Sequence, residues 1–347
     1  MKKIKTLIFL PLLSGLLTGC IGNKEYKPEE YMISTNWNGE GEYKILQLSD
    51  IHLSQSDVYD KHFDVIKRTI NKAKPNMIVL NGDIFTYADK RLVKQTFSFI
   101  DSFDVPWTFA YGNHDDQGYY NDTYIQRLLA KNGKYKNVLF KNLQDDNVTG
   151  RSNFVINIKN GENVAYQVFV MDSHSYNFDT NGYDFLKQDQ IDWYKRIVDY
   201  STDELGGGSV IPSSLYMHIG MTEACDEEYW KEVQGTPNHI LGSMEEFAGS
   251  PKEDLGIFDI IKNLNSTKSI HVAHDHANDS VIKRDDIYIC FGVHSTDRVY
   301  NDEKGVKLGG QLLSIDKATK ELSFTNLYAS YDSDEVKEVN HVEKEAK

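Results

Sequence analysis

Hydrophobic residues along the chain recur in two alternating patterns, which predict strands and helices in turn. Short runs that are almost entirely apolar are typical of buried strands, and longer stretches repeat their apolar positions at helical spacing. In the first third the patterns predict strands at 44–48, 77–80 and 107–110, and helices at 58–73, 91–99 and 122–130. Strands and helices that alternate in this way indicate crossover units and a parallel sheet.

The rest of the chain predicts a second group of elements. Strands are expected at 154–158, 164–171, 215–219, 270–273, 287–291, 311–315 and 321–326, with one clear helix at 190–198. Two sheets packed together and flanked by helices would use all of these elements in one domain. We therefore predict a domain at 43–332, after a signal at 1–19 and a polar tether at 20–42, with a solvated, charged tail at 333–347.

The first twenty residues have the pattern of an export signal. A basic start is followed by a mostly apolar run from Leu7 to Leu17, which is too short to span a membrane. The segment Leu17-Thr18-Gly19-Cys20 resembles the lipobox of bacterial lipoproteins. This resemblance implies cleavage before Cys20, lipidation of its thiol, and an exported domain anchored to the bacterial membrane and facing outside the cytoplasm. The alternative is an ordinary signal peptide with an incidental cysteine.

Composition and charge narrow the class of protein and of ligand. With 347 residues, 40% of them hydrophobic and 26% charged, the chain has the composition of an ordered globular protein. Its net charge of −14 becomes −17 without residues 1–19, which contain three lysines. A body this acidic repels nucleic acid and anionic lipid unless it carries a positive centre such as bound metal, so no nucleic-acid partner is expected. Cys225 and Cys290 are too few for a zinc–thiolate site, and they are either free or bridged.

Polar residues with metal-binding side chains follow five of the predicted strands. The clusters are Asp50-Ile51-His52, Gly82-Asp83, Gly112-Asn113-His114-Asp115, His218 and His274-Asp275-His276. Ligands of parallel sheets bind beyond the carboxyl ends of the strands, so these loops are expected to converge. Carboxylate, imidazole and amide oxygen together suit manganese, iron or zinc. The number of candidate ligands predicts two divalent transition-metal ions.

Taken singly, each cluster has an ordinary structural explanation, because an Asp or Asn after a strand is often a turn residue or helix cap. The ordered set favours a site, since about thirty residues separate the first three clusters, which is the length of a crossover unit. We assign Asp50, His52 and His276 to one ion, Asn113, His218 and His274 to the other, and Asp83 to a bridge between them.

This ordered series of clusters resembles the calcineurin-like metallophosphoesterase superfamily, from residue 43 to about 295. The segments Tyr111–Asp116, Met171–His174 and His274–Asp279 are further similar to a subgroup of phosphatases related to the purple acid phosphatases. The resemblance implies an α/β fold, a two-sheet βαβ sandwich flanked by helices. It also implies an enzyme in which a hydroxide shared by two metal ions attacks phosphorus in line.

The same resemblance implies roles for residues beside the ligands. His114 is the histidine that stabilises the transition state or protonates the leaving oxygen, and Asp115 would orient its ring. Purple acid phosphatases have a tyrosine ligand three residues after the bridging Asp, whereas this chain has Thr86 there and Tyr87 one position further on. This difference predicts a colourless enzyme.

The sequence leaves contacts with the substrate open. His174 is either a contact to the substrate phosphate or a turn residue bonded to Asp172, and His294 is a similar candidate. Aromatic residues near the motif loops, such as Tyr119, Tyr120 and Tyr176, either flank a leaving group or simply pack.

The favoured function is hydrolysis of small phosphomonoesters, with a small phosphorylated molecule as substrate. One alternative is a phosphodiesterase that acts on nucleotides or lipid headgroups. Another is a lipid-anchored protein that binds phosphorylated ligands without turnover. Sequence does not separate the two hydrolases, because the metal core is shared and specificity lies in loops. The oligomeric state is equally open.

Overall fold

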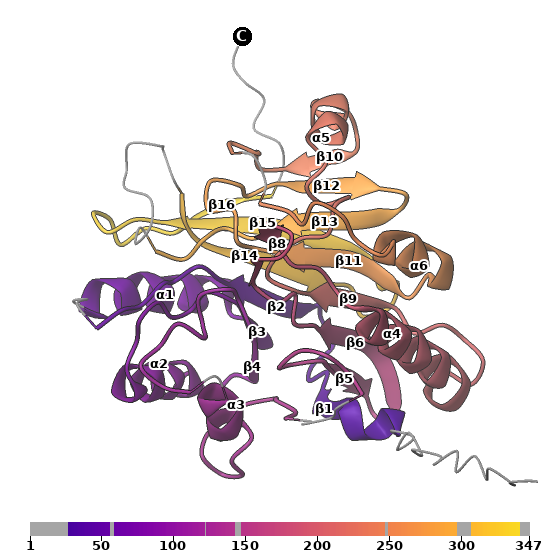
Figure 1. Cartoon of the computed structure of the whole chain (residues 1–347), viewed down its shortest axis with the longest axis horizontal. Coiled ribbons are helices and arrows are strands. Elements are labelled where there is room, and N and C mark those ends of the chain that lie inside the picture. The colour runs from indigo at the N-terminus through magenta and orange to yellow at the C-terminus, as the bar shows by residue number, and fades with distance from the viewer. Residues whose placement is uncertain are drawn as a thin grey trace, which may run out of the picture.

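The computed structural model describes residues 27–55, 59–121, 123–142, 147–246, 249–296 and 307–340. Two β-sheets form the centre of the molecule, and helices cover their outer faces (Figure 1). The predicted α/β sandwich is confirmed. The predicted signal and Cys20 lie outside the described residues. Within those residues, no helix is both long and apolar enough to cross a membrane.

The six-stranded sheet contains the predicted crossover units. Its order is β16-β15-β14-β2-β3-β4, in which β2, β3 and β4 run parallel and the other neighbours pair antiparallel. Every residue of β3 and β4 is buried, as expected for strands covered on both faces. The bounds are β2 Tyr43–Leu48, β3 Met77–Asn81, β4 Trp107–Ala110, β14 Leu308–Ile315, β15 Leu322–Ala329 and β16 Lys337–Val339.

The eight-stranded sheet is mixed, with the order β1-β5-β6-β9-β11-β13-β12-β10. Its central strands β6, β9, β11 and β13 run parallel. The bounds are β1 Met32–Asn36, β5 Phe154–Asn160, β6 Asn163–Val170, β9 Ser213–Tyr216, β10 His239–Leu241, β11 Thr267–Val272, β12 Val281–Arg284 and β13 Ile287–Phe291. A separate small hairpin consists of β7 Tyr176–Asn177 and β8 Gly182–Tyr183.

The helices cover the sheets with apolar faces. The helix α1 packs on β2, β14 and β15, while α4 and α6 pack together over the eight-stranded sheet. The side chain of Asp89 caps α2 by accepting the N–H of Leu92, which satisfies one of the unpaired donors at a helix start. The bounds are α1 Tyr59–Ala73, α2 Lys90–Asp101, α3 Tyr124–Leu129, α4 Gln188–Tyr200, α5 Glu227–Val233 and α6 Ile257–Leu264, with a 3₁₀ turn at Pro28–Tyr31 and a π turn at Ser201–Leu205.

Two predicted boundaries are wrong. The folded domain begins before residue 43, because β1 pairs with β5 inside the stretch predicted as a tether. It also extends past residue 332, because β16 pairs with β15 inside the predicted tail. Both are short edge strands with exposed side chains, so their hydrophobic pattern is weak. Cys225 and Cys290 are both free thiols, so they are not bridged to each other.

The loops after β3 and β4 approach each other too closely for most side chains. Gly82 has a φ of +85°, and a Cβ atom there would overlap the ring of His218. A Cβ atom at Gly112 would overlap the carboxylate of Asp83. Only glycine leaves room at both positions, so the backbone itself forms part of the packing around Asp83.

The carboxylate of Asp115 holds these two loops together. Its Oδ1 accepts the backbone N–H groups of Ile84 and Phe85 at 2.9 and 3.0 Å, and its Oδ2 accepts those of Asp83 and Gly112 at 2.9 and 2.8 Å. The side chain is fully buried, and four donors occupy both of its oxygens. Asp115 therefore links the backbones of these two loops through hydrogen bonds.

Replacing Asp115 with Asn is expected to lower the free energy of unfolding by about 3 kcal/mol, because the amide group turns an N–H donor toward backbone N–H donors. Urea denaturation measures this change. The control is Asp116→Asn, since that carboxylate forms a partly exposed ion pair with Arg151 at 3.1 Å and its loss should cost less than about 1 kcal/mol. Equal losses in the two variants would contradict the role of Asp115.

Candidate metal centre

The five motif loops meet at one edge of the sandwich, because β2, β3 and β4 in one sheet and β9 and β11 in the other all end there. Four motif residues have left-handed backbones, with φ of 52° at Asp50, 50° at His52, 51° at Asp83 and 74° at His274. Each such conformation costs on the order of 1 kcal/mol in a residue other than glycine. Backbone strain of this kind is common among the residues of functional sites.

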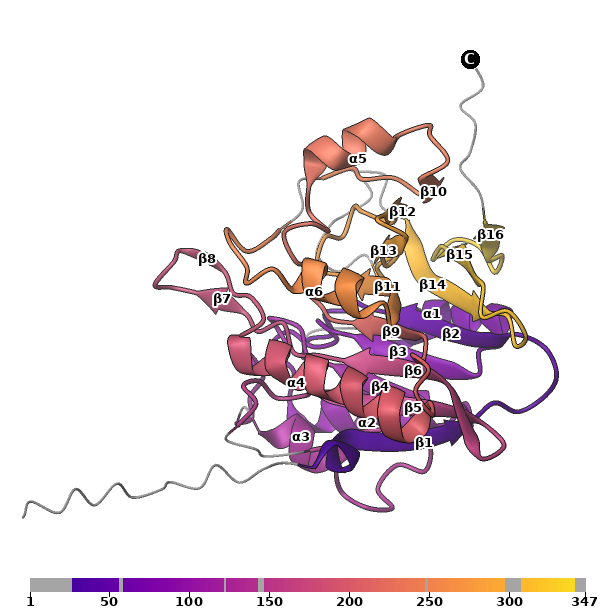
Figure 2. The ribbon, with the colours of Figure 1, turned by 90° about the vertical axis from the view of Figure 1, so that its right-hand side faces the viewer.

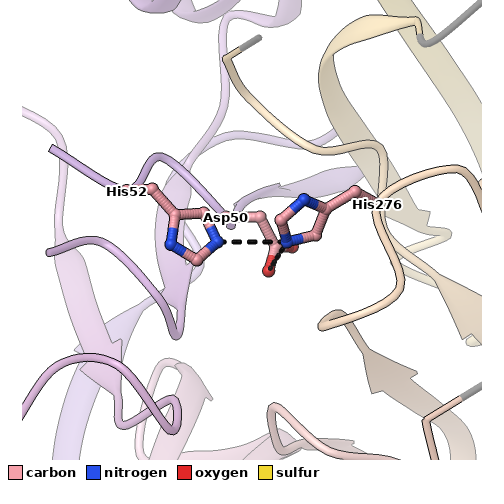
Figure 3. Close-up of side chains that lie close together, drawn as sticks. All are labelled: Asp50, His52 and His276. Carbon is pink, nitrogen blue, oxygen red and sulfur yellow. Dashed lines mark hydrogen bonds and ion pairs between the residues drawn. The ribbon is translucent and has the colours of Figure 1, made fainter. Parts of the chain in front are cut away.

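Asp50, His52 and His276 form the first group of candidate ligands (Figure 3). The Nε2 atoms of the two imidazoles face each other at 3.0 Å, and Nε2 of His276 lies 3.5 Å from Asp50 Oδ1. Asp50 and His52 come from the loop after β2 and His276 from the loop after β11, and all three side chains point to one spot. A shared cation accommodates two facing imidazole lone pairs and a carboxylate better than a hydrogen bond does.

Asp83 belongs to two further groups, one with His218 and His274 and one with His52 and His114. Its Oδ2 lies 3.1 Å from His218 Nε2, 3.7 Å from His52 Nε2 and 4.0 Å from His114 Nε2. Asp83 therefore lies between the two sets of residues that we assigned to separate ions. This is the position that the bridging role requires.

Several buried polar atoms here have no hydrogen-bond partner. They are Oδ2 of Asp50, Oδ1 of Asn113 and Nε2 of His218. A buried polar atom without a partner costs about 1–3 kcal/mol. His218 Nε2 is near Asp83 but lacks the direction of a hydrogen bond, as expected for two ligands that face a common ion. The residues present thus fit divalent ions that bind oxygen and imidazole nitrogen.

Two contacts behind the ligands set the orientation of their rings. The Nδ1–H of His218 donates to the carbonyl oxygen of Asn81 at 2.9 Å, so the lone pair of Nε2 faces the centre. Nδ1 of His52 lies 2.8 Å from Oγ1 of Thr86, and its Nε2 likewise faces the centre. Thr86 therefore contacts a candidate ligand, while Tyr87 is an exposed residue on the surface.

The charges in the centre are balanced between carboxylates and imidazoles. Burial acts to raise the pKa of Asp50, but the hydrogen bond and charge of His276 outweigh it and lower that pKa. Burial likewise acts to raise the pKa of Asp83, and the charge of His218 is the largest cause that lowers it. Burial opposes protonation of His218, yet the charge of Asp83 raises its pKa to about 10. Burial lowers the pKa of His52 to about 4. Metal ions would therefore compete with protons for this site.

His114 lies at the open side of the centre and is partly exposed. Its Nδ1 is 2.8 Å from Oε1 of Gln117, and its backbone N–H donates to Oδ1 of Asp83 at 2.7 Å. The prediction that Asp115 orients the ring of His114 is wrong, because Asp115 binds backbone N–H groups and Gln117 contacts the ring. Sequence reasoning missed Gln117, which follows His114 by three residues, the spacing of a single turn.

The two further candidate histidines lie beside the motif loops. The backbone N–H of His174 donates to Asp172 at 2.9 Å and its Nε2 is 2.7 Å from Gln190 Oε1, which agrees with the turn interpretation. His294 is buried, and its Nδ1 donates to the carbonyl oxygen of His276 at 2.7 Å. Each ring thus contacts another protein group, Gln190 for His174 and the backbone of His276 for His294.

Proteins of known name have sequences similar to this chain. Over 286 residues the chain is 26% identical to phosphatase DCR2 of Saccharomyces cerevisiae, an alignment that covers 73% of this chain and 48% of that protein. It is 24% identical over 293 residues to a protein of Arabidopsis thaliana named probable inactive purple acid phosphatase 14, covering 74% and 71%. This chain therefore spans only about half the length of the yeast protein.

A solved structure shares the fold. The crystal structure of a dimetal phosphatase from Danio rerio superposes with a TM-score of 0.54 at 8% identity, covering 86% of this chain and 99% of that one. Residues 43–308 match the sequence model of the calcineurin-like phosphoesterases. That match includes all seven candidate ligands, so the chain belongs to the calcineurin-like phosphoesterase family.

Proposed function

We propose that this protein is a metal-dependent hydrolase that holds two divalent ions and cleaves phosphomonoesters. The observation that carries the proposal is the position of Asp83 between two groups of buried ligands. When bound, two ions would lower the pKa of a water molecule and draw negative charge from the phosphate oxygens. In the reaction the oxygen of water bonds to phosphorus, the ester P–O bond breaks, and the leaving oxygen takes a proton to give an alcohol.

His114 is the residue that we propose as proton donor to the leaving oxygen. Its side chain is 36% exposed, so the ring lies at the open side of the centre. Because Gln117 Oε1 accepts the Nδ1–H, a proton on Nε2 makes the ring a cation, which is the form that donates. Oδ2 of Asp83 lies 4.0 Å from Nε2, so this nitrogen faces the candidate ligands.

A phospholigand-binding protein without turnover is the second candidate, because one relative carries the name of a probable inactive phosphatase. The presence of every candidate ligand together with His114 favours the hydrolase. Within the hydrolases, faster cleavage of a bis-aryl phosphate than of a mono-aryl phosphate would assign the site to diesters instead.

The Asp83→Asn variant is expected to lose most of its bound metal and at least ~100-fold of its rate, because it removes a carboxylate that faces both groups. Elemental analysis and hydrolysis of p-nitrophenyl phosphate measure the two effects on protein that lacks residues 1–20. The matched control is Asp285→Asn, since Asp285 forms an exposed ion pair with Lys262 at 2.8 Å, in the turn between β12 and β13. Wild-type protein with two ions per chain that hydrolyses no phosphoester would favour the binding protein.

The metal-loaded protein should show no strong visible absorption band. Such a band needs a tyrosinate bound to ferric iron, but the position of that tyrosine holds Thr86, which contacts His52, and the side chain of Tyr87 is 56% exposed. Visible absorption spectra of the iron-loaded and the zinc-loaded protein test this prediction. An intense band in the iron-loaded sample alone would show that a tyrosine reaches the metal.

We further propose that the domain is exported and anchored through lipidated Cys20, on the basis of the signal pattern at 1–19. Expressed in a bacterium, the full chain should fractionate with membranes and incorporate labelled palmitate, and Cys20→Ser should lose the label because the acceptor thiol is gone. Cys225→Ser is the control, because that thiol lies in the folded domain. Equal labelling of wild type and Cys20→Ser would refute the anchor.

A further inference from the structure

Exposed aromatic side chains gather around the candidate metal centre. Among the residues that the structure describes, six large hydrophobic side chains are exposed, and four of these are aromatic. They are Tyr87 at 56%, Tyr119 at 65%, Tyr176 at 40% and Phe178 at 87%. All four lie on segments joined to candidate site residues by direct contacts. Exposed aromatic rings at one functional edge indicate a binding surface.

On one side, a series of ring contacts leads from a candidate ligand to solvent. The ring of Tyr183 meets His274 edge-on with centroids 4.4 Å apart, Tyr176 lies 5.9 Å from Tyr183, and Phe178 lies 5.1 Å from Tyr176. The series ends at the most exposed of the six side chains.

The hairpin that carries these rings is held in place. Figure 2 shows β7 and β8 projecting from the body of the molecule. Tyr183 forms a bridge to Pro251, Lys252 Nζ donates to the carbonyl oxygen of Thr180 at 2.9 Å, and the hydroxyl of Tyr176 donates to Asn181 at 2.6 Å. Phe178 is thus presented to solvent on an ordered turn, and its exposure is a property of the fold.

On the other side, Tyr87 and Tyr119 lie on loops that contact His52 and His114. Tyr87 follows Thr86, whose hydroxyl contacts His52. The backbone N–H of Tyr119 donates to Ala88 at 2.8 Å, which joins its loop to that of Tyr87. The centre therefore has exposed aromatic residues on the segments that flank both of its ligand groups.

We propose that this site selects phosphoesters whose leaving group carries a flat aromatic ring, which packs against Tyr176 and Phe178 while the phosphate lies at the metal centre. The inference rests on the proposed function. Stacking of one ring on an aromatic side chain contributes roughly fivefold to 150-fold in affinity, which is about 1–3 kcal/mol. The net charge of −14 argues against these rings inserting into an anionic membrane, where basic residues would accompany them.

A matched pair of substrates isolates the contribution of the ring. Adenosine 5′-monophosphate and ribose 5-phosphate present the same phosphate on the same primary oxygen, and they differ in the base. We expect kcat/KM to be about tenfold or more higher for the nucleotide. Equal values for the two substrates would overturn the inference while leaving the hydrolase intact. If metal-loaded protein hydrolysed none of adenosine 5′-monophosphate, ribose 5-phosphate and p-nitrophenyl phosphate, the result would instead count against the proposed function.

Substitutions in the hairpin test whether its aromatic rings cause the preference for the nucleotide. In Phe178→Ala, and more fully in Tyr176→Ala with Phe178→Ala, the ratio of the two kcat/KM values should fall toward one. Phe178 is almost fully exposed, so its removal does not threaten folding. The control is Val210→Ala, because Val210 is 44% exposed and lies before the start of β9, whereas His218 follows its end. An unchanged ratio in the double variant would contradict the role of the hairpin.

Binding without turnover gives an independent test. Saturation-transfer NMR with adenosine should show contact between its base and the metal-loaded wild type, and weaker contact with the double variant. Sedimentation with vesicles of phosphatidylcholine and phosphatidylglycerol addresses the membrane alternative. Co-sedimentation that is lost in the double variant, with no transfer to adenosine, would assign the rings to a lipid surface and overturn our inference.

Discussion

The side chain of Asn81 joins the two sheets at the point where the candidate ligands meet. Its Nδ2 donates to the backbone carbonyl oxygens of Met217 and His271, both at 3.2 Å, while the backbone carbonyl oxygen of Asn81 accepts the Nδ1–H of His218. Nearby, Gln47 Nε2 donates to Val272 at 2.9 Å. Because one sheet supplies Asp50 and Asp83 and the other supplies the late histidines, any sliding between sheets would separate the ligands. Buried amides that lose all their partners are costly, so these bonds fix the register.

This fixed register allows the loops above it to be strained. Four candidate ligands occupy left-handed conformations, and each must be held by its surroundings. Asp115 supplies part of that support by binding four backbone N–H groups in the loops after β3 and β4. The hydrophobic core also stabilises this part of the fold, because β3 and β4 are buried along their whole length.

Much of the fold and the convergence of the motif loops could be predicted, since both depend on local patterns. Runs such as 77–80 and 107–110 are apolar because both faces of the strand are buried, and residues after parallel strands meet at one edge. The edge strand β1 was missed, since a half-exposed strand has little pattern. The role of Asp115 was misjudged, because adjacency to His114 in sequence does not decide where a side chain points. Contacts between distant segments, such as Asp115 with Ile84, are absent from any local pattern.

The fold leaves two unfavourable features at one edge. Buried atoms such as Asp50 Oδ2 and His218 Nε2 have no partner, and large rings such as Phe178 are exposed to water. Each feature weakens the isolated chain, by the cost of unpaired polar atoms in one case and of exposed apolar surface in the other. Bound metal ions would give the unpaired polar atoms partners. An apolar group on the substrate would cover the exposed rings. A single ligand, a phosphate ester with an aromatic ring, would satisfy both parts of this edge at once, which is why we connect them.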